Sequence, residues 1–222
     1  MSCIKDFYDS YWQVEYPLPE GDPWINFRKK LLSKYLINYV DSHSIILDAG
    51  CGSGDLLSFI SKLGYNVIGI DISAIALKKA HNKYPLHDFI LSSIDAIPFK
   101  NDSFDAVWFS EVLEHVVDVH KSLIELRRVI KENGILIITT PYHGLIKNIC
   151  ISLFAFNRYF DPYGSHIRFF SKKSLNKCLK RAGFKTIICR GAGRLFPFQR
   201  FILSVSIKQD HSNPPIHGTS SL

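Results

Sequence analysis

The sequence has few cysteines, and those present are not arranged to bond to one another or to a metal ion. There are five, an odd number, and no two have the C-x-x-C spacing. Neither a disulfide framework nor a zinc knuckle is therefore indicated. Because free cysteines are typical of reducing compartments, we expect a cytoplasmic protein.

Long apolar runs and export signals are lacking as well. The longest apolar stretch, residues 149–156, is far short of the roughly 18–20 residues that cross a bilayer. The first ten residues contain no basic start followed by an apolar core, so they do not have the pattern of a secretory signal. We expect neither a transmembrane segment nor a cleaved leader.

Blocks of like charge are absent, although the chain is basic. The formal net charge is +7, but the lysines and arginines occur in scattered pairs such as Arg127–Arg128 rather than in long runs. Such pairs are typical of solvated helix faces, and a nucleic-acid or anionic membrane surface is the alternative. We expect a small-molecule partner rather than nucleic acid.

What the sequence does contain is an alternation of short apolar runs and amphipathic segments, without internal repeats. Its 222 residues suit one domain, which we expect at 1–208, followed by a mobile polar tail at 209–222. The expected strands are 44–50, 66–71, 87–93, 103–110, 135–140, 184–190 and 201–208, and the expected helices are 55–64, 73–84, 118–134 and 171–183.

This alternation predicts an α/β fold with a mostly parallel sheet and helices on both faces. In such sheets, ligands bind at the carboxyl ends of the strands. Two polar motifs follow predicted strands directly, namely LDAGCGSG at 47–54 and SEVLEHV at 110–116. We therefore expect both motifs to line one ligand crevice.

The first motif is a glycine-rich loop that opens a predicted helix. Gly50, Gly52 and Gly54 permit positive φ and close approach of a ligand. The loop has Asp55 where the third glycine of the dinucleotide fingerprint G-x-G-x-x-G would fall, and it lacks the G-K-[ST] of a P-loop. Asp71 ends the second predicted strand, where a carboxylate can accept both hydroxyls of a ribose. A tight strand–helix turn with a capping acid is the alternative.

Four ordered motifs resemble those of class I S-adenosylmethionine (SAM)-dependent methyltransferases, in particular methyltransferase type 11 and the ubiquinone-biosynthesis O-methyltransferases. They are LDAGCGSG, GIDIS, SSIDAIPF and FDAVWFSEVLEHV, followed by ENGILIITTP, and the resemblance runs from about residue 43 to 208. It implies a Rossmann-like, seven-stranded sheet in the order 3-2-1-4-5-7-6, with strand 7 antiparallel. It also implies methyl transfer from SAM.

The resemblance also implies which residues hold SAM. Asp48 and the first two glycines would face its methionine part, and Asp71 would bind the ribose hydroxyls. Ile72 would pack on the adenine, Asp95 would accept from the adenine amino group, and the backbone of Ser110 would contact the sulfonium. The full set is Arg28, Asp48, Gly50, Gly52, Asp71, Ile72, Asp95 and Ser110.

Two further segments are expected to cover the crevice. Residues 1–42 would form an N-terminal helical cap, in which Arg28 meets the methionine carboxylate and the aromatic stretch at 5–12 is either a second lid or a simple docking segment. Residues 141–170 would form a substrate-cap insert. The aromatic residues of this insert suit an apolar or ring-bearing acceptor, and a lid packed on the core is the alternative.

The second motif permits three interpretations. Glu111 and Glu114 favour a helix start, with His115 packed in the core. Alternatively, His115 is a lone general base. In the third interpretation, one helical turn gathers the two acids and His115 as ligands of a divalent cation. The resemblance to the E-x-x-E-H motif of the ubiquinone enzymes implies His166 as the fourth ligand, and this set suits Mg²⁺, Mn²⁺ or Zn²⁺.

Taken together, these motifs predict an enzyme that moves a methyl group from SAM to a small-molecule acceptor, on oxygen. The predicted catalytic residues are Glu111, Glu114 and His115, with a divalent cation as a possible second cofactor. An RNA methyltransferase and a non-catalytic SAM- or nucleotide-binding regulator are the alternatives. An acidic site beside the glycine loop favours an enzyme over the regulator.

Overall fold

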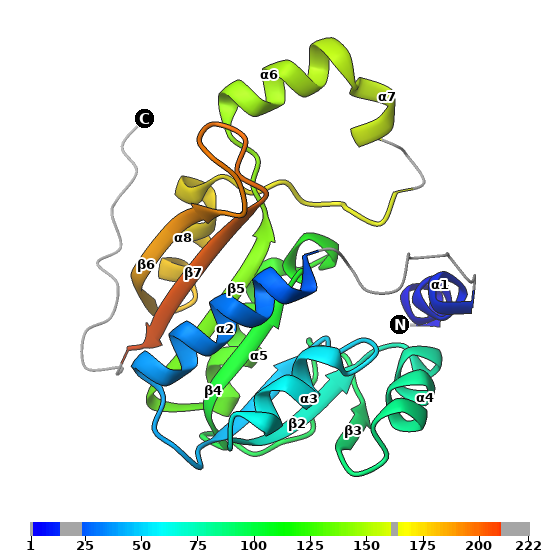
Figure 1. Cartoon of the computed structure of the whole chain (residues 1–222), viewed down its shortest axis with the longest axis vertical. Helices are drawn as coiled ribbons and strands as arrows, with labels where there is room; N and C mark the ends of the chain where they lie inside the picture. Colours follow the sequence, from blue (N-terminus) through cyan, green and yellow to red (C-terminus); the bar gives the residue numbers. More distant parts are fainter. Residues whose placement is uncertain (1, 14–23, 161–163, 210–222) are drawn as a thin grey trace.

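A computed structural model describes residues 2–13, 24–160 and 164–209. These residues form a seven-stranded sheet with helices on both faces (Figure 1). The sheet order is β3-β2-β1-β4-β5-β7-β6, and β7 is antiparallel to both of its neighbours. The predicted fold class and strand order are confirmed. Except for its first residue, the mobile tail predicted at 209–222 lies outside the described residues.

The first five strands pair in parallel and carry the apolar runs read from the sequence. In β4 every residue but one is buried, as expected for a central strand that is covered on both faces. The strands are β1 (Ile45–Ala49), β2 (Asn66–Asp71), β3 (Asp88–Leu91), β4 (Phe104–Ser110), β5 (Ile130–Pro141), β6 (Phe184–Ala192) and β7 (Phe201–Lys208).

Several helix ends lie where capping residues predict them. Ser73 and Ser171 accept hydrogen bonds from the first-turn amides of α4 and α8, and glycines with positive φ follow the ends of α3 and α8. The helices are α1 (Ser2–Gln13), α2 (Ile25–Tyr39), α3 (Asp55–Lys62), α4 (Ala74–Lys83), α5 (Val119–Val129), α6 (Leu145–Phe154), α7 (Phe156–Tyr159) and α8 (Lys172–Arg181), with a 3₁₀ turn, η1 (Leu113–His115).

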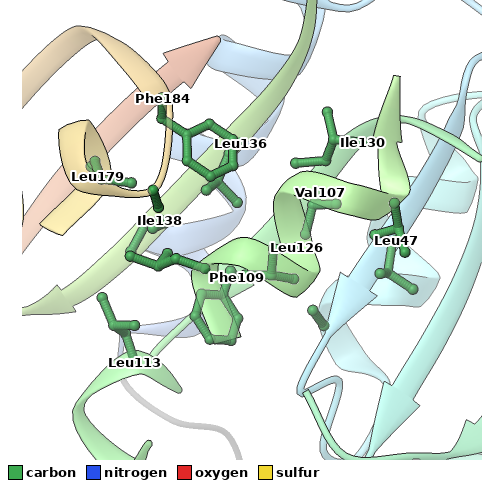
Figure 2. Packing of buried hydrophobic residues seen from close by; sticks show 14 of the residues in the cluster. Leu47, Val107, Phe109, Leu113, Leu126, Ile130, Leu136, Ile138, Leu179 and Phe184 are labelled. Carbon is green, nitrogen blue, oxygen red and sulfur yellow. The ribbon is translucent and has the colours of Figure 1, made fainter. Parts of the chain in front are cut away.

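The sheet separates two hydrophobic clusters. On one face, α5 and α8 cover the central strands, with Leu126 and Leu179 directed toward Phe109 and Ile138 (Figure 2). On the other face, α2 and α3 pack around the fully buried Trp108. Successive side chains of a strand point to opposite faces, so Trp108 and Phe109 fill different clusters. Both faces of the central strands are covered, and the polar motifs follow at their carboxyl ends.

One predicted element differs from the structure. The helix expected at 118–134 ends at Val129, and the strand expected at 135–140 already begins at Ile130. Ile130 is fully buried beside Phe104 in the sheet, and the register shifts before the main pairing of β5 with β4 resumes. Asn133 adopts a φ of +63° within this irregular stretch. A short apolar pair such as Val129–Ile130 fits a helix and a strand equally well, which explains the wrong boundary.

The two segments expected to cover the crevice both contain helices. In residues 1–42 they are α1 and α2, and in residues 141–170 they are α6 and α7. Figure 1 shows α6 and α7 beyond the end of the sheet at which β5 finishes. Within the described residues, no helix is both long enough and apolar enough to cross a membrane.

Candidate active site

The glycine loop joins β1 to α3 and is folded tightly against its neighbours. The amides of Gly50 and Cys51 both donate to the carbonyl of Ile70, at 2.8 and 2.9 Å. Gly50 has a φ of +78°, and a Cβ added there would lie 2.4 Å from Cγ2 of Val112. The loop therefore requires glycine at this position for two separate reasons, its backbone conformation and the close approach of Val112.

A comparison of two glycines separates these reasons. We expect Gly50→Ala to lower the free energy of unfolding by more than Gly64→Ala. Both positions have positive φ, which costs an alanine about 1–2 kcal/mol. Only the alanine at Gly50 meets a side chain, because nothing lies within 4 Å of a Cβ at Gly64. The overlap with Val112 adds roughly 1–3 kcal/mol. Denaturant unfolding measures both variants, and equal losses would show that Val112 yields without cost.

Asp71 closes the loop from the end of β2. One carboxylate oxygen accepts from the amide of Gly52 at 2.9 Å, and the other accepts from the amide of Ser73 at 2.9 Å. Burial raises the pKa of Asp71, and these amides oppose the shift by stabilising the charged form. Each oxygen retains a second lone pair, so the carboxylate can still accept from a ligand.

Asp48 and Arg28 bring a buried carboxyl group and a cation to the carboxyl ends of β1 and β4. Asp48 is 2% exposed, and its Oδ2 has no hydrogen-bond partner within the described parts of the chain. Burial and then the nearby Asp71 raise the pKa of Asp48 to about 7, while Arg28 lowers it. Arg28 reaches in from α2, and its Nη1 donates to the hydroxyl of Ser110 at 3.5 Å. A buried acceptor thus lies close to a fixed cation.

Two of the predicted adenine contacts lie after β2 and β3. The carboxylate of Asp95 accepts a hydrogen bond from the hydroxyl of Ser122 in α5, which orients it. Ile72 follows β2 directly and is half-buried. Ile72 thus adjoins Asp71 at the end of β2, and Asp95 follows the end of β3 beside α5.

The two acids of SEVLEHV do not share a turn of α-helix, so that part of the prediction is wrong. Glu111 has a φ of +54°, which non-glycine residues seldom adopt, and only a three-residue 3₁₀ turn follows. The amide of Glu111 donates to the carbonyl of Thr139 at 2.9 Å, and the Thr139 hydroxyl donates to Glu111 Oε1 at 3.0 Å. Pairing with β5, rather than helical spacing, positions this acid.

Glu114 is directed into the protein. It is 1% exposed, and its Oε2 accepts from the hydroxyl of Thr140 at 2.9 Å. Burial, and then the charge of Glu111, hold its pKa well above the usual range. The backbone carbonyl of Glu114 accepts from the amides of Ile167 and Arg168, both at 3.0 Å. These two bonds hold the segment before α8 against the carboxyl end of β4.

This segment brings His166 next to His115. The two rings lie 4.9 Å apart, centroid to centroid. His115 Nδ1 is 2.8 Å from the carbonyl of Ser165, and because a carbonyl only accepts, Nδ1 carries the hydrogen. The lone pair on Nε2 is therefore available, 3.9 Å from Glu114 Oε1. Burial lowers the pKa of His115, and loss of hydration together with His115, His143 and Arg200 lowers that of His166 to about 4.

Of the predicted metal ligands, the structure gathers three and leaves one aside. One ligand atom from each of Glu114, His115 and His166 lies within 4.8 Å of the others. Glu111 is not part of this group, since its carboxylate is turned toward Thr139. An acid and two neutral imidazoles are a typical ligand set for a transition-metal ion or Zn²⁺.

Helix α1 docks on α4 through Asp9. The Asp9 carboxylate accepts from the Ser73 hydroxyl at 2.7 Å and from the Ile75 amide at 3.3 Å, at the N-terminus of α4. Lys79 of α4 donates to the backbone carbonyl of Trp12 at 2.8 Å. These contacts join residues far apart in the sequence, so they could not be predicted from local patterns. The acidic and aromatic residues at 5–12 were the only local indication that this segment docks.

The same helix spans the crevice from the glycine loop to the histidines. The Trp12 ring lies against Gly52, where an added Cβ would be 3.0 Å from it. The Tyr8 ring stands edge-on to His115 at 5.9 Å. Burial raises the pKa of Tyr8 to about 12, with further contributions from Glu114 and Asp71. Tyr8 therefore lies between the two acidic parts of the site, a role that the sequence did not assign to it.

Comparison with known proteins agrees with this geometry. A family model described as a methyltransferase domain matches residues 24–188, which is most of the chain. The chain belongs to this methyltransferase family. The methyltransferase domain that the motifs predict is thereby confirmed.

The relatives of this methyltransferase act on different acceptors. It is 31% identical over 104 residues to a malonyl-[acyl-carrier protein] O-methyltransferase of Salmonella typhimurium, covering 47% of this chain and 41% of that protein. It is 30% identical over 121 residues to a ubiquinone/menaquinone biosynthesis C-methyltransferase of Campylobacter jejuni, covering 51% and 52%. The chain thus spans about half the length of these relatives, or less. An uncharacterized protein of Methanocaldococcus jannaschii is 27% identical over 92% of this chain and 86% of its own length.

Solved structures share the fold of the methyltransferase. The PH0226 protein of Pyrococcus horikoshii superposes with a TM-score of 0.71 at 19% identity, over 90% of this chain and 99% of that one. A Burkholderia thailandensis 1,6-didemethyltoxoflavin N1-methyltransferase, solved with its substrate and S-adenosylhomocysteine, gives 0.71 at 14% identity, over 94% and 89%. At these identities the likeness concerns the fold.

Proposed function

We propose that this methyltransferase transfers a methyl group from SAM to an oxygen of a small molecule with two adjacent oxygens, assisted by a divalent cation. The observation that supports the proposal is the convergence of Glu114, His115 and His166 beside the carboxyl end of β4. Arg28 links this group to the glycine-loop side, because its charge lowers the pKa of both Asp48 and Glu114.

SAM fits the residues on the glycine-loop side. The buried Oδ2 of Asp48 would accept from the ammonium of its methionine part, and Arg28 would meet the carboxylate. Asp71, held by two amides, would accept from the ribose hydroxyls. SAM supplies an electrophilic methyl group. The residues proposed to bind it are Arg28, Asp48, Gly50, Gly52, Asp71, Ile72, Asp95 and Ser110.

A divalent cation fits the group of Glu114, His115 and His166. Oε1 of Glu114 has no hydrogen-bond partner within the described residues, and Nε2 of His115 has a lone pair. Ligand atoms around one ion lie about 3–4 Å apart. Small side-chain rotations would bring the ligand atoms of these three residues to that separation. Glu111 stands beside the group and would join through an acceptor or a water molecule.

These residues would act on the acceptor in two ways. Holding its oxygen in line with the methyl group contributes roughly 7–11 kcal/mol when the geometry is good. A cation at Glu114 and the histidines would favour the ionised oxygen. Without a cation, His115 Nε2 would take the proton as a general base, worth about 10²–10⁴ in rate.

The insert at 141–170 would shape the acceptor pocket. Its helices α6 and α7 lie beyond the end of the sheet at which β5 finishes (Figure 1). Tyr142 at the start of the insert pairs with Phe170 at its end, so both ends are held at the sheet.

A methyl-transfer assay with labelled SAM tests the proposal. We expect catechol to accept the label, phenol to accept far less, and chelation of divalent cations to remove the difference between the two. A short RNA with a terminal 2′,3′-diol tests the RNA alternative in the same assay. Labelling of the RNA at physiological salt, with none of catechol or aliphatic vicinal diols, would overturn the small-molecule proposal.

A further inference from the structure

A hollow lies apart from the glycine-loop side, between α6–α7 and the loop that joins β6 to β7. Its volume is about 220 Å³. The cations Lys147, Arg194 and Arg200 line it together with apolar side chains that include Phe154 and Phe198. Figure 1 shows the β6–β7 loop beside α6. Lys147 and Phe154 belong to the insert proposed above to shape the acceptor pocket, but no individual role was given there to any of these side chains.

The cations of this hollow are held in place. Lys147 Nζ donates to the carbonyls of Tyr142 and Gln199, at 2.8 and 3.3 Å. The guanidinium groups of Arg194 and Arg200 lie over the Trp24 ring, 5.8 and 5.6 Å from its centre. Their positions therefore derive from backbone and aromatic contacts, which leaves the charges themselves to be balanced.

No ion pair balances these charges in the part of the chain that the structure describes, although Glu111 is near enough to raise the pKa of Lys147. Among those residues, no carboxylate forms an ion pair with Lys147, Arg194 or Arg200. Burial lowers the pKa of Lys147 to about 8, and repulsion by Arg200 and Arg194 contributes to the shift. An anion in the hollow would relieve that repulsion and form charge-assisted hydrogen bonds.

The apolar walls require more of the ligand than a charge. Phe154 is 84% exposed and Phe198 is 49% exposed, which is unusual for large rings. Ile151 of α6 lines the same hollow. A ligand with an acidic group and an apolar body satisfies both sets of residues, whereas an inorganic anion would leave the rings in water.

The hollow also lies close to the proposed reaction centre. The charge of Glu111 raises the pKa of Lys147, and Arg200 lowers the pKa of His166. The amide of Tyr142 donates to the carbonyl of Arg200 at 3.0 Å, which ties the start of the insert to the lining of the hollow. One molecule can therefore occupy the hollow and extend toward Glu111.

We propose that the methyl acceptor carries a carboxylate or phosphate group on an apolar body, and that Lys147, Arg194 and Arg200 bind this acidic group. The proposal rests on the function proposed above only in naming the ligand as the acceptor. It adds a feature that the cation site does not predict, an acid remote from the methylated oxygen.

Titration calorimetry with small probes tests the hollow directly. The probes are octanoate, octyl phosphate and octanol, each added to the protein saturated with S-adenosylhomocysteine. We expect both anions to bind and octanol to bind at least about tenfold more weakly, as for the loss of a charge-assisted contact. A comparison of the affinities for octanoate and octyl phosphate shows whether the hollow prefers a carboxylate or a phosphate group. Equal affinity for octanol and the anions would overturn the proposal.

Two variants with matched controls locate the binding. We expect Lys147→Met and Arg194→Gln each to weaken the binding of octanoate about tenfold or more. The affinity for S-adenosylhomocysteine should stay unchanged. The controls Lys177→Met and Arg181→Gln change exposed cations of α8, and we expect no effect from them. Unchanged octanoate binding in both hollow variants overturns the proposal. The proposal is also overturned if the protein binds anionic phospholipid vesicles through these cations but does not bind octanoate.

The outcome is separable from that of the methyl-transfer assay. Selective octanoate binding without any labelling of catechol or diols would support the hollow and overturn the proposed acceptor chemistry. Labelling of catechol without octanoate binding would support the proposed acceptor chemistry and overturn the proposal for the hollow. In the assay, octanoate competes with the true acceptor and not with SAM.

Discussion

Replacement of Glu114 by glutamine is expected to reduce methyl transfer by a factor on the order of 10²–10³, at every concentration of added Mg²⁺, Mn²⁺ or Zn²⁺. Glutamine has the shape of glutamate and can still accept from the Thr140 hydroxyl. It lacks the charge that would bind a cation beside His115 and His166. Steady-state kinetics after chelation and metal titration measure the loss, and calorimetry measures the binding of the metal alone.

The stability of the same variant separates this effect from misfolding. The folded-state pKa of Glu114 lies above its usual value because the group is buried near Glu111. Its contribution to stability is therefore most favourable below the unfolded-state pKa and decreases as the pH rises through the raised pKa. We expect metal-free Glu114→Gln to be at least as stable as the wild type at pH 8, and only the wild type to gain stability from the metal.

An exposed acid provides the control for Glu114. Glu132 lies on the irregular start of β5, and its side chain is 46% exposed. We expect Glu132→Gln to leave both turnover and metal affinity unchanged. If chelators leave the wild-type activity intact, the cation is absent from the mechanism. The lone-base role of His115 then predicts a fall in rate as the pH drops through the pKa of His115, which burial lowers.

The second large effect concerns Asp71. We expect Asp71→Ala to weaken SAM binding by about 1.5–3 kcal/mol, or roughly 10–150-fold, because charge-assisted hydrogen bonds to the ribose are lost. The measurement is calorimetric titration with SAM and with S-adenosylhomocysteine. An unchanged dissociation constant would remove Asp71 from the cofactor site.

A conservative variant distinguishes direct contact from a shift of the loop. Asp71 also accepts from the amides of Gly52 and Ser73, so alanine disturbs the glycine loop as well as the ligand. Asp71→Asn retains an acceptor for one of these amides but loses the charge. We expect it to have an intermediate affinity for SAM with a free energy of unfolding close to that of the wild type.

Much of the fold was predictable because its signals are local. Ser73, Ser171 and Gly183 marked helix ends that the structure reproduces, since a cap needs only a few neighbouring residues. Gly50 and its loop were likewise predictable from spacing. The boundary at Val129 was not, because pairing of Ile130 with Phe104 decides it and no local pattern reports that pairing.

The site was predictable in composition but less so in geometry. Glu114 and His115 could be named from the motif, yet their orientation depends on Thr140 and on the carbonyl of Ser165. The left-handed conformation of Glu111 had no sequence signal, since glutamate seldom adopts it. Tyr8 reaches His115 only because α1 docks on α4, a contact between segments far apart in the sequence. Contacts between distant segments therefore account for most of what the sequence did not reveal.

The position of α1 has a consequence for the kinetics of cofactor exchange. Trp12 lies on the glycine loop and Asp9 is bonded to the start of α4, so α1 covers the place proposed for SAM. Each turnover leaves S-adenosylhomocysteine beneath this helix. We expect its departure to require α1 to separate from α4, so that the residence time of the product depends on how long those few contacts last.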